Sequence, residues 1–233
     1  MASAKGSPGC SFVAIGLAAR LAAAGLPTLL VDADAEDGTL AGRLDLARAD
    51  GGAALGSLGP LSEAAIAGAA TATRAGFQLL DLSGRESSLD GRQVAEVGRL
   101  RYPAIVVDIG HGPGRLQREL VAGADWLLWV IAPDRAGFDR ADRVLSAEVL
   151  PRVSAGIVLN RLGPDRLADA GAVLAERHRL PLLARLPESP RAARDAAHRC
   201  TSPDRAREFR HQFGELARCV HPDVVESGGQ AWP

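Results

Sequence analysis

Short apolar runs alternate with segments of helical periodicity along the whole chain, and this alternation restricts the possible folds most strongly. Such runs, bounded by polar or turn residues, are typical of strands, and we expect strands at residues 28–32, 77–80, 104–108, 126–132, 155–160 and 182–186. Strands that are apolar throughout are buried on both faces, as in a parallel sheet covered by helices on each side. The pattern predicts an α/β fold of three layers, with a mostly parallel central sheet and helices on both faces.

Helices are expected in the remaining periodic segments, at residues 11–24, 61–70, 92–100, 115–122, 135–150, 164–178, 190–198 and 203–220. The chain has 233 residues, of which 47% are hydrophobic, so it can bury one large core. We therefore expect a single domain over residues 1–226. The glycine-rich and polar residues 227–233 are expected to form a flexible tail.

The charge balance and the cysteines limit the class of protein. A net charge of −1 and a pI of about 6.5 argue against a nucleic-acid partner. The three cysteines form no CxxC pair, which argues against a zinc site or a disulfide framework. No apolar run reaches the roughly 20 residues of a membrane span, and the first residues do not resemble a signal peptide. We expect a cytoplasmic protein without a membrane segment.

Arginines gather toward the C-terminal end of the chain, where acidic residues are interleaved with them. This mixture is more typical of a solvated helix face than of a surface that binds DNA. The arginines concerned are Arg191, Arg194, Arg199, Arg205, Arg207 and Arg210.

A glycine-rich loop, Ala4-Lys5-Gly6-Ser7-Pro8-Gly9-Cys10-Ser11, stands directly before the first expected helix. Small residues let backbone N–H groups curl around phosphate oxygens, and the N-terminus of the following helix attracts negative charge. Lys5 is the only lysine in the chain. The loop predicts a phosphate site. Because only Met1 to Ala4 precede it as a strand, we also expect the natural protein to begin upstream of Met1.

Polar residues close several of the expected strands. Asp32 ends the strand at 28–32 and Asp34 lies two residues further on, Asp108 ends the strand at 104–108, and Asn160 ends the strand at 155–160 directly before Arg161. Ligands of parallel α/β sheets lie beyond the carboxyl ends of the strands. We expect these side chains to meet the phosphate loop at one edge of the sheet.

The order and spacing of these motifs resemble the MinD/ParA family of P-loop ATPases, whose deviant Walker A loop reads KGGxGK[ST]. The resemblance covers roughly residues 1–197 and implies ATP and Mg²⁺ as cofactors. Lys5 matches the lysine that reaches the partner's phosphates in a nucleotide-sandwich dimer, and Asp34 matches the aspartate that positions the attacking water. Ser11, Asp32 and Asp108 match residues around the magnesium ion.

The same resemblance assigns residues to the rest of the nucleotide. Asn160 and Arg161 match an adenine-recognising pair, and Pro187 falls where a loop closes over the base. The loop itself supplies Lys5, Gly6, Ser7, Gly9, Cys10 and Ser11. The segment from Asp108 to Gly112, which includes His111, is similar to switch II.

Cys10 departs from the family pattern, because it occupies the place of the lysine that contacts the β- and γ-phosphates. Two explanations stay open, a redox-sensitive thiol at a helix N-terminus and drift in a decaying site. The resemblance implies an ATP-dependent homodimer that positions a cellular cargo through an unidentified protein partner, with weak or absent hydrolysis. A CpaE-like branch fits this pattern.

Two alternatives use the same residues. The first is a pseudo-ATPase scaffold, which keeps the fold and binds a protein partner without nucleotide. The second is an amidotransferase-associated synthetase with a related loop, which is disfavoured because such enzymes also use the missing lysine.

Overall fold

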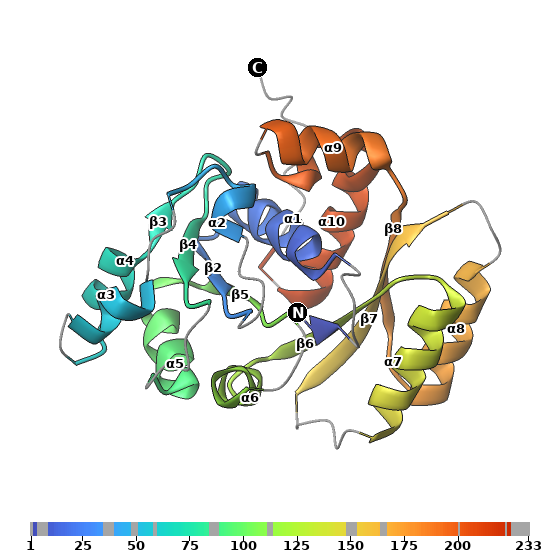
Figure 1. Ribbon diagram of the computed structural model, residues 1–233, viewed down its shortest axis with the longest axis horizontal. Coiled ribbons are helices and arrows are strands. Elements are labelled where there is room, and N and C mark those ends of the chain that lie inside the picture. Colours follow the sequence, from blue (N-terminus) through green and yellow to red (C-terminus); the bar gives the residue numbers. More distant parts are fainter. Residues whose placement is uncertain are drawn as a thin grey trace.

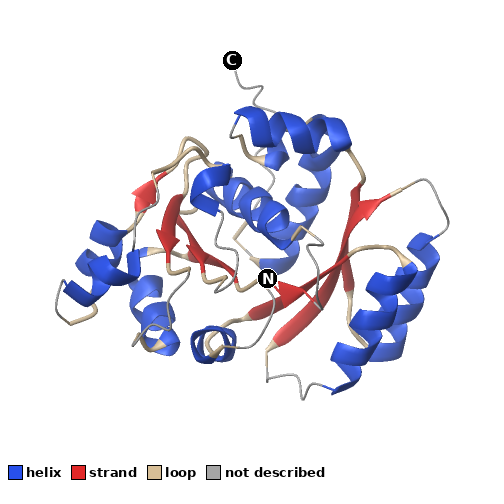
Figure 2. Cartoon of the chain, in the orientation of Figure 1, coloured by secondary structure: helices blue, strands red, loops and turns tan. Residues whose placement is uncertain are grey.

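The computed structural model describes residues 2–3, 9–34, 40–47, 51–57, 60–83, 89–110, 114–147, 153–163, 167–199, 201–221 and 223–224. Within them, strands form the middle of the molecule and helices cover both sides (Figure 1). Figure 2 shows the same arrangement by type of secondary structure. The three-layer α/β fold predicted from the sequence is confirmed.

The strands form two four-stranded groups. One has the order β1-β6-β7-β8, and the other has the order β3-β4-β2-β5. Among the described pairings, β3 runs antiparallel to β4 and the other neighbours are parallel. The strands are β1 (Ala2–Ser3), β2 (Thr28–Asp32), β3 (Thr71–Ala72), β4 (Gln78–Asp81), β5 (Ala104–Asp108), β6 (Trp126–Ile131), β7 (Ser154–Leu162) and β8 (Leu182–Pro187).

The helices lie on both sides of the strands (Figure 1). Those of the N-terminal half are α1 (Cys10–Ala23), α2 (Leu40–Arg43), α3 (Gly51–Ser57), α4 (Glu63–Ala69), α5 (Gly91–Arg101) and α6 (Arg115–Ala122). The C-terminal half adds α7 (Arg135–Ala147), α8 (Leu167–His178), α9 (Pro190–Arg199), a 3-10 turn at Pro203–Arg205 and α10 (Arg207–Val220).

One hydrophobic core joins the two groups of strands. Buried side chains of α1 and α10 pack in a single cluster with Leu30 and Val106 of one group and Val130 and Val158 of the other. The two helices approach closely because Gly16 of α1 has no side chain, and the ring of Phe213 fills the place of its Cβ. The helix pair therefore holds both groups of strands from one side.

Two further clusters cover the opposite side. Leu29, Val31 and Leu80 pack with α4, α5 and α6, while Trp129 and Ile157 pack with α7 and α8. Each central strand is thus buried on both faces, which explains why β2, Thr28–Asp32, is buried along its whole length.

Most expected elements are found with small differences at their ends. The strands at 28–32 and 104–108 and the helix at 115–122 have the predicted bounds. The helix expected over 203–220 was wrong in its first turn, because the extended backbone of Ala206 separates the 3-10 turn from α10. The sequence did not predict α2, α3 or β3. Residues 148–150 and 164–166, which were expected to be helical, lie outside the described residues.

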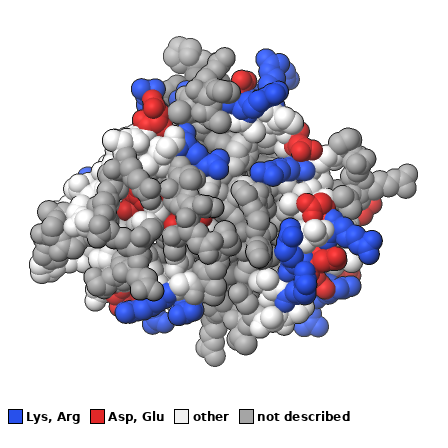
Figure 3. Space-filling view, in the orientation of Figure 1, with Lys and Arg blue, Asp and Glu red and all other residues white. Residues whose placement is uncertain are grey.

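Charges of both signs are mixed on the surface. On the face drawn in Figure 3, arginine side chains lie among aspartates and glutamates. Arg191, for example, lies 3.9 Å from Asp195 on α9. Among the described helices, none has the length and apolar character needed to cross a membrane.

Candidate functional site

Three aspartates stand in a row at the carboxyl ends of adjacent parallel strands. The strand register places Asp81 of β4 beside Asp32 of β2, and Asp32 beside Asp108 of β5. Their side chains are buried, with 7%, 1% and 1% of the surface exposed. Buried carboxylates on neighbouring strands repel one another unless hydrogen bonds, protons or a cation compensate their charge.

Backbone N–H groups compensate Asp32. Its Oδ1 accepts a hydrogen bond from the N–H of Asp34 at 3.2 Å, and its Oδ2 accepts one from Leu40 at 3.1 Å. Burial nevertheless raises the pKa of Asp32 to about 7, against the effect of these two bonds, and the neighbouring Asp108 and Asp81 raise it further. Asp32 thus ties Asp34 and the first residue of α2 to the end of β2.

Asp108 is less well compensated. Its Oδ1 accepts a hydrogen bond from the N–H of Gly110 at 3.2 Å, whereas its buried Oδ2 has no partner in hydrogen-bond geometry within the described chain. Burial raises the pKa of Asp108, while the nearby Ser11 hydroxyl acts to lower it and Asp34 acts to raise it. The carboxylate therefore has one oxygen that is ready to accept a cation or a donor.

Asp34 lies across from the end of β5. Its carboxylate occupies the space that a Cβ at Gly110 would take, with Oδ1 at 2.6 Å from that position. Gly110 also has a φ of 58°, in the left-handed region that favours glycine. The turns after β2 and β5 are therefore packed against each other, and Asp34 and Asp108 belong to one site.

The N-terminus of α1 faces this site. Gly9 precedes the helix with a φ of 89°, no side chain caps the helix, and its first turn contains no acidic residue. The first N–H groups of a helix have no partners within the helix and attract anions. Ser11 lies in this first turn, near Asp108. Cys10 is 7% exposed and belongs to the core cluster beneath α1.

Asn160 of β7 packs against Gly9, the residue directly before α1. Its side chain is 3% exposed, and its Nδ2 occupies the space that a Cβ at Gly9 would take. Arg161, by contrast, is exposed and has a left-handed φ of 67°. Pro187 is close by, because Leu162 pairs with it in the β7–β8 register. These three predicted residues lie near one another, with Asn160 next to Gly9.

Gln117 is a residue of the site that sequence reasoning missed. It lies in α6 and is 5% exposed, and its Nε2 donates a hydrogen bond of 2.7 Å to the carbonyl of Ala33. Its Oε1 lies where a Cβ at Gly114 would be. Gln117 thereby links the turn between Asp32 and Asp34 to the start of α6.

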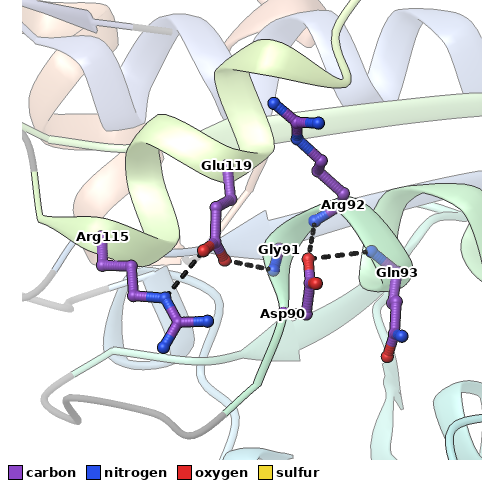
Figure 4. A network of polar contacts seen from close by, with 6 residues as sticks. All are labelled: Asp90, Gly91, Arg92, Gln93, Arg115 and Glu119. Carbon is purple, nitrogen blue, oxygen red and sulfur yellow. Dashed lines mark hydrogen bonds and ion pairs between the residues drawn. The ribbon is translucent and has the colours of Figure 1, made fainter.

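A polar network fixes the position of α6 (Figure 4). Asp90 caps α5, and Glu119 accepts a hydrogen bond of 2.9 Å from the N–H of Gly91. Arg115 forms an ion pair with Glu119 at 2.7 Å and lowers the pKa of that carboxyl group. The start of α5 is thereby joined to the helix that carries Gln117.

The oxygen atoms of this site suit a hard cation that is also bound by phosphate and water. Asp108 offers a carboxylate oxygen without a partner and Ser11 a hydroxyl, and Mg²⁺ prefers such oxygens. Among the described residues, no group of three or more His, Cys, Asp or Glu side chains could hold a metal ion by itself. This fits Mg²⁺, which is commonly bound by one or two protein groups together with phosphates and water. Lys5, Gly6, Ser7 and His111 lie outside the described residues.

Sequence comparison relates the chain to one family. The family model described as the CobQ/CobB/MinD/ParA nucleotide binding domain matches residues 1–200. None of the curated protein sequences matches significantly.

Solved structures with the same fold include three of different function. A ParA family ATPase from Chlorobium tepidum TLS has a TM-score of 0.76 and 17% identity, over 95% of this chain and 96% of that chain. The MinC:MinD cell division protein complex from Aquifex aeolicus has a TM-score of 0.73 and 20% identity, over 100% of this chain and 96% of that chain. Cobyrinic acid a,c-diamide synthase from Mycobacterium smegmatis, with bound ATP analog and magnesium, has a TM-score of 0.68 and 17% identity, over 98% of this chain and 95% of that chain. At these identities the likeness shows the fold.

Proposed function

The chain belongs to the CobQ/CobB/MinD/ParA family of nucleotide-binding domains, and from this premise we propose that it binds ATP with Mg²⁺ at the carboxyl edge of β2 and β5. The family match confirms the predicted resemblance to MinD and ParA proteins. The CpaE-like branch stays a prediction. We place the protein in the cytoplasm, where ATP is available.

One observation carries the proposal. The buried Oδ2 of Asp108 lacks a partner in the described chain, and it lies near the hydroxyl and the N-terminus of α1. A buried carboxylate oxygen without a partner costs about 1–3 kcal/mol or more. A cation held between this oxygen and an anion at the helix N-terminus would remove that cost, which supports a magnesium–phosphate ligand.

Each predicted site residue would have a distinct role in binding ATP and Mg²⁺. Ser11, Asp32 and Asp108 would hold the magnesium ion, Asp32 mainly by keeping the turn after β2 in place. A magnesium ion held there would supply positive charge next to the phosphates of the nucleotide. The loop of Lys5, Gly6, Ser7, Gly9, Cys10 and Ser11 would surround the phosphates. Asn160, Arg161 and Pro187 would border the base, since Asn160 contacts Gly9 and Leu162 pairs with Pro187.

We further propose a nucleotide-dependent homodimer with weak or absent hydrolysis. Lys5 would reach the phosphates of the partner subunit, and Asp34 would orient the attacking water. Cys10 cannot supply the positive charge that the family's lysine brings to the transition state, so hydrolysis is expected to be slow. We also propose a role in positioning a cellular cargo through a protein partner, because the order and spacing of the sequence motifs resemble those of MinD and ParA proteins.

The second candidate is a pseudo-ATPase scaffold. The burial of Cys10 in the core cluster favours it, because residue 10 contributes to packing rather than to phosphate contact. In that case the protein would bind its partner without nucleotide.

Calorimetry with ATP and MgCl₂ separates the two candidates. If the protein binds ATP, wild type should show measurable affinity for ATP with Mg²⁺. The affinity should be lower for Asp108→Ala and higher for Cys10→Lys. A charge-assisted hydrogen bond of about 1.5–3 kcal/mol corresponds to a gain of roughly 10- to 100-fold in affinity for Cys10→Lys.

The control combines Cys10→Lys with Asp34→Ala, which should bind ATP and fail to hydrolyse it. Light scattering should detect a dimer with ATP and MgCl₂, and a monomer after Lys5→Ala. Flat heats for wild type and for Cys10→Lys at millimolar ATP would contradict ATP binding and support the scaffold.

A further inference from the structure

Helix α6 is held by hydrogen bonds on two nearly opposite sides. Gln117 donates from Nε2 to the carbonyl of Ala33 at 2.7 Å, and Glu119 accepts a hydrogen bond of 2.9 Å from the N–H of Gly91. Residues two apart in an α-helix differ by about 200° in direction, so these two side chains leave α6 on nearly opposite sides. One bond reaches the turn after β2, and the other reaches the start of α5.

Ala33 is fixed tightly at the end of α6 that faces the site. It is 1% exposed, its N–H donates to the carbonyl of Asp108 at 2.8 Å, and its own carbonyl accepts the bond from Gln117. The backbone of Ala33 is thus held between β5 and α6. The carboxylate of the next residue, Asp34, is packed against Gly110. A shift of α6 would therefore pull on the backbone that carries Asp34.

The start of α5 packs against the same turn of α6. A Cβ at Gly91 would lie 2.8 Å from the carbonyl oxygen of Leu116 and 2.9 Å from the backbone nitrogen of Leu120, so the two helices are in direct backbone contact. Glu119 closes this contact, because its carboxylate accepts the N–H of Gly91 (Figure 4). The contact spans the turn of α6 that carries Gln117.

We propose that Glu119 is a positioning residue, which acts through Gln117 on the turn that carries Asp34 and so couples the contact of α5 and α6 to the site at the ends of β2 and β5. α6 has 8 residues, about 12 Å in length, and a helix this short moves as one body. Without Glu119 it would stay packed through Leu116 and Leu120 but would be free to shift on the side of α5. The effect on ATP binding rests on the proposed function, whereas the effect on the turn does not.

Hydrogen exchange without nucleotide tests the coupling. In Glu119→Ala, the amides of Ala33 and Asp34 should exchange about 3- to 10-fold faster than in wild type, which is the factor expected for the loss of one hydrogen bond. The amide of Val158 lies in β7, in the other group of strands, and reports on opening of the whole fold. Its exchange should change less than that of Ala33.

A conservative variant and a matched control complete this experiment. In Glu119→Gln the side-chain oxygen can still accept the N–H of Gly91, so exchange at Ala33 should stay close to wild type. Asp142 likewise joins two helices, α7 and α8, through an ion pair of 3.0 Å with Arg177 on the side of the other group of strands (Figure 1). Asp142→Ala should leave exchange at Ala33 unchanged.

Two further measurements include ATP and MgCl₂. The affinity for ATP should fall about 3- to 10-fold in Glu119→Ala, and adding Glu119→Ala to Gln117→Leu should lower it no further. Energetic coupling is reciprocal. ATP with MgCl₂ should therefore slow exchange at the amide of Gly91 in wild type and leave it unaltered in Gln117→Leu.

Unchanged exchange at Ala33 and Asp34 in Glu119→Ala would overturn the proposal. An equal acceleration in Glu119→Gln or in Asp142→Ala would overturn it as well, and so would additive losses of ATP affinity in the double variant. If wild type shows no affinity for ATP, the proposed nucleotide site fails. The exchange rates at Ala33 then still decide whether Glu119 positions the turn.

Discussion

Asp108 is the residue where burial and charge conflict most directly. Burial raises its pKa and that of Asp32 above the values in the unfolded chain, so the folded chain keeps these protons to a higher pH. The folded state then binds more protons than the unfolded state, and stability falls as the pH rises from about 4 to about 7. The ligand-free protein should accordingly be more stable at pH 5 than at pH 8 as far as this site is concerned.

Asp108→Asn tests this conclusion. The amide oxygen can still accept the N–H of Gly110, and the charge is gone. At pH 8 without ligand the variant should be more stable than wild type by about 1–3 kcal/mol, and the difference should shrink at pH 5. Thermal melts at both pH values measure it. ATP with MgCl₂ should stabilise wild type more than the variant; a variant that is less stable than wild type at pH 8 without ligand would contradict the prediction.

Gln117→Leu removes the bond between the two turns at nearly constant volume. The buried carbonyl of Ala33 loses its donor, which should lower the free energy of unfolding by about 1–3 kcal/mol. ATP–Mg²⁺ affinity should fall as well, because Asp32 and Asp34 flank Ala33. Denaturant unfolding and calorimetry measure the two effects.

The matched control is Gln93→Leu on the exposed side of α5, which should change stability by no more than about 0.5 kcal/mol. Equal changes in stability at the two positions would mean that the hydrogen bond from Gln117 to Ala33 does not stabilise the fold.

Part of the site could be predicted from the sequence alone, because polar residues stand at the ends of the expected strands. Asp32, Asp34 and Asp108 were predicted because they follow apolar runs, and the structure brings them together. Asp81 follows its run in the same way, so the same signal would have found it. Gln117 had no such signal, because a polar residue in an amphipathic helix looks solvated until the neighbouring turn is known.

At the scale of elements, the contact between α1 and α10 depends on Gly16. A Cβ there would overlap the ring of Phe213, so Gly16→Ala should destabilise the protein by about 1–3 kcal/mol. In a Phe213→Leu background the cost of Gly16→Ala should be lower by at least about 0.5 kcal/mol. Chemical unfolding of the four proteins of this cycle measures the coupling.

Gly42→Ala is the control for helix propensity, because nothing lies within 4 Å of a Cβ at that position of α2. It should be neutral or slightly stabilising. Additive effects of Gly16→Ala and Phe213→Leu would show that the two helices can separate to accept the methyl group.

Elements with their own periodic signal were predicted well, and those made by tertiary contacts were not. β2 and β5 are apolar runs closed by aspartate, and their bounds were predicted to the residue. α3, Gly51–Ser57, contains three glycines, which have low helix propensity, so it gave no signal. β3 has two residues and exists through its pairing with β4.

For the whole molecule, the shared core beneath α1 and α10 predicts a single unfolding transition. Leu30 lies in β2, whereas Trp126 and Trp129 lie in the other group of strands. In a Trp232→Phe background, Leu30→Ala should lower the midpoint of the tryptophan fluorescence and that of circular dichroism equally. The expected loss for such a core substitution is about 2–5 kcal/mol. A fluorescence midpoint that stays unchanged would indicate two independent units.

The contact between Asn160 and Gly9 has a consequence for how such a chain changes over generations. A side chain at residue 9 would collide with Asn160 and would also need a left-handed backbone, so packing alone keeps glycine there, with or without a nucleotide. Asp108 is in the opposite situation, because its buried carboxylate costs stability unless a ligand compensates it. In a lineage that stopped binding ATP, Asp108 would be replaced early and Gly9 late. Across related genomes, we therefore expect the residue at position 108 to change with the loss of ligand binding and the glycine at position 9 to persist with the fold.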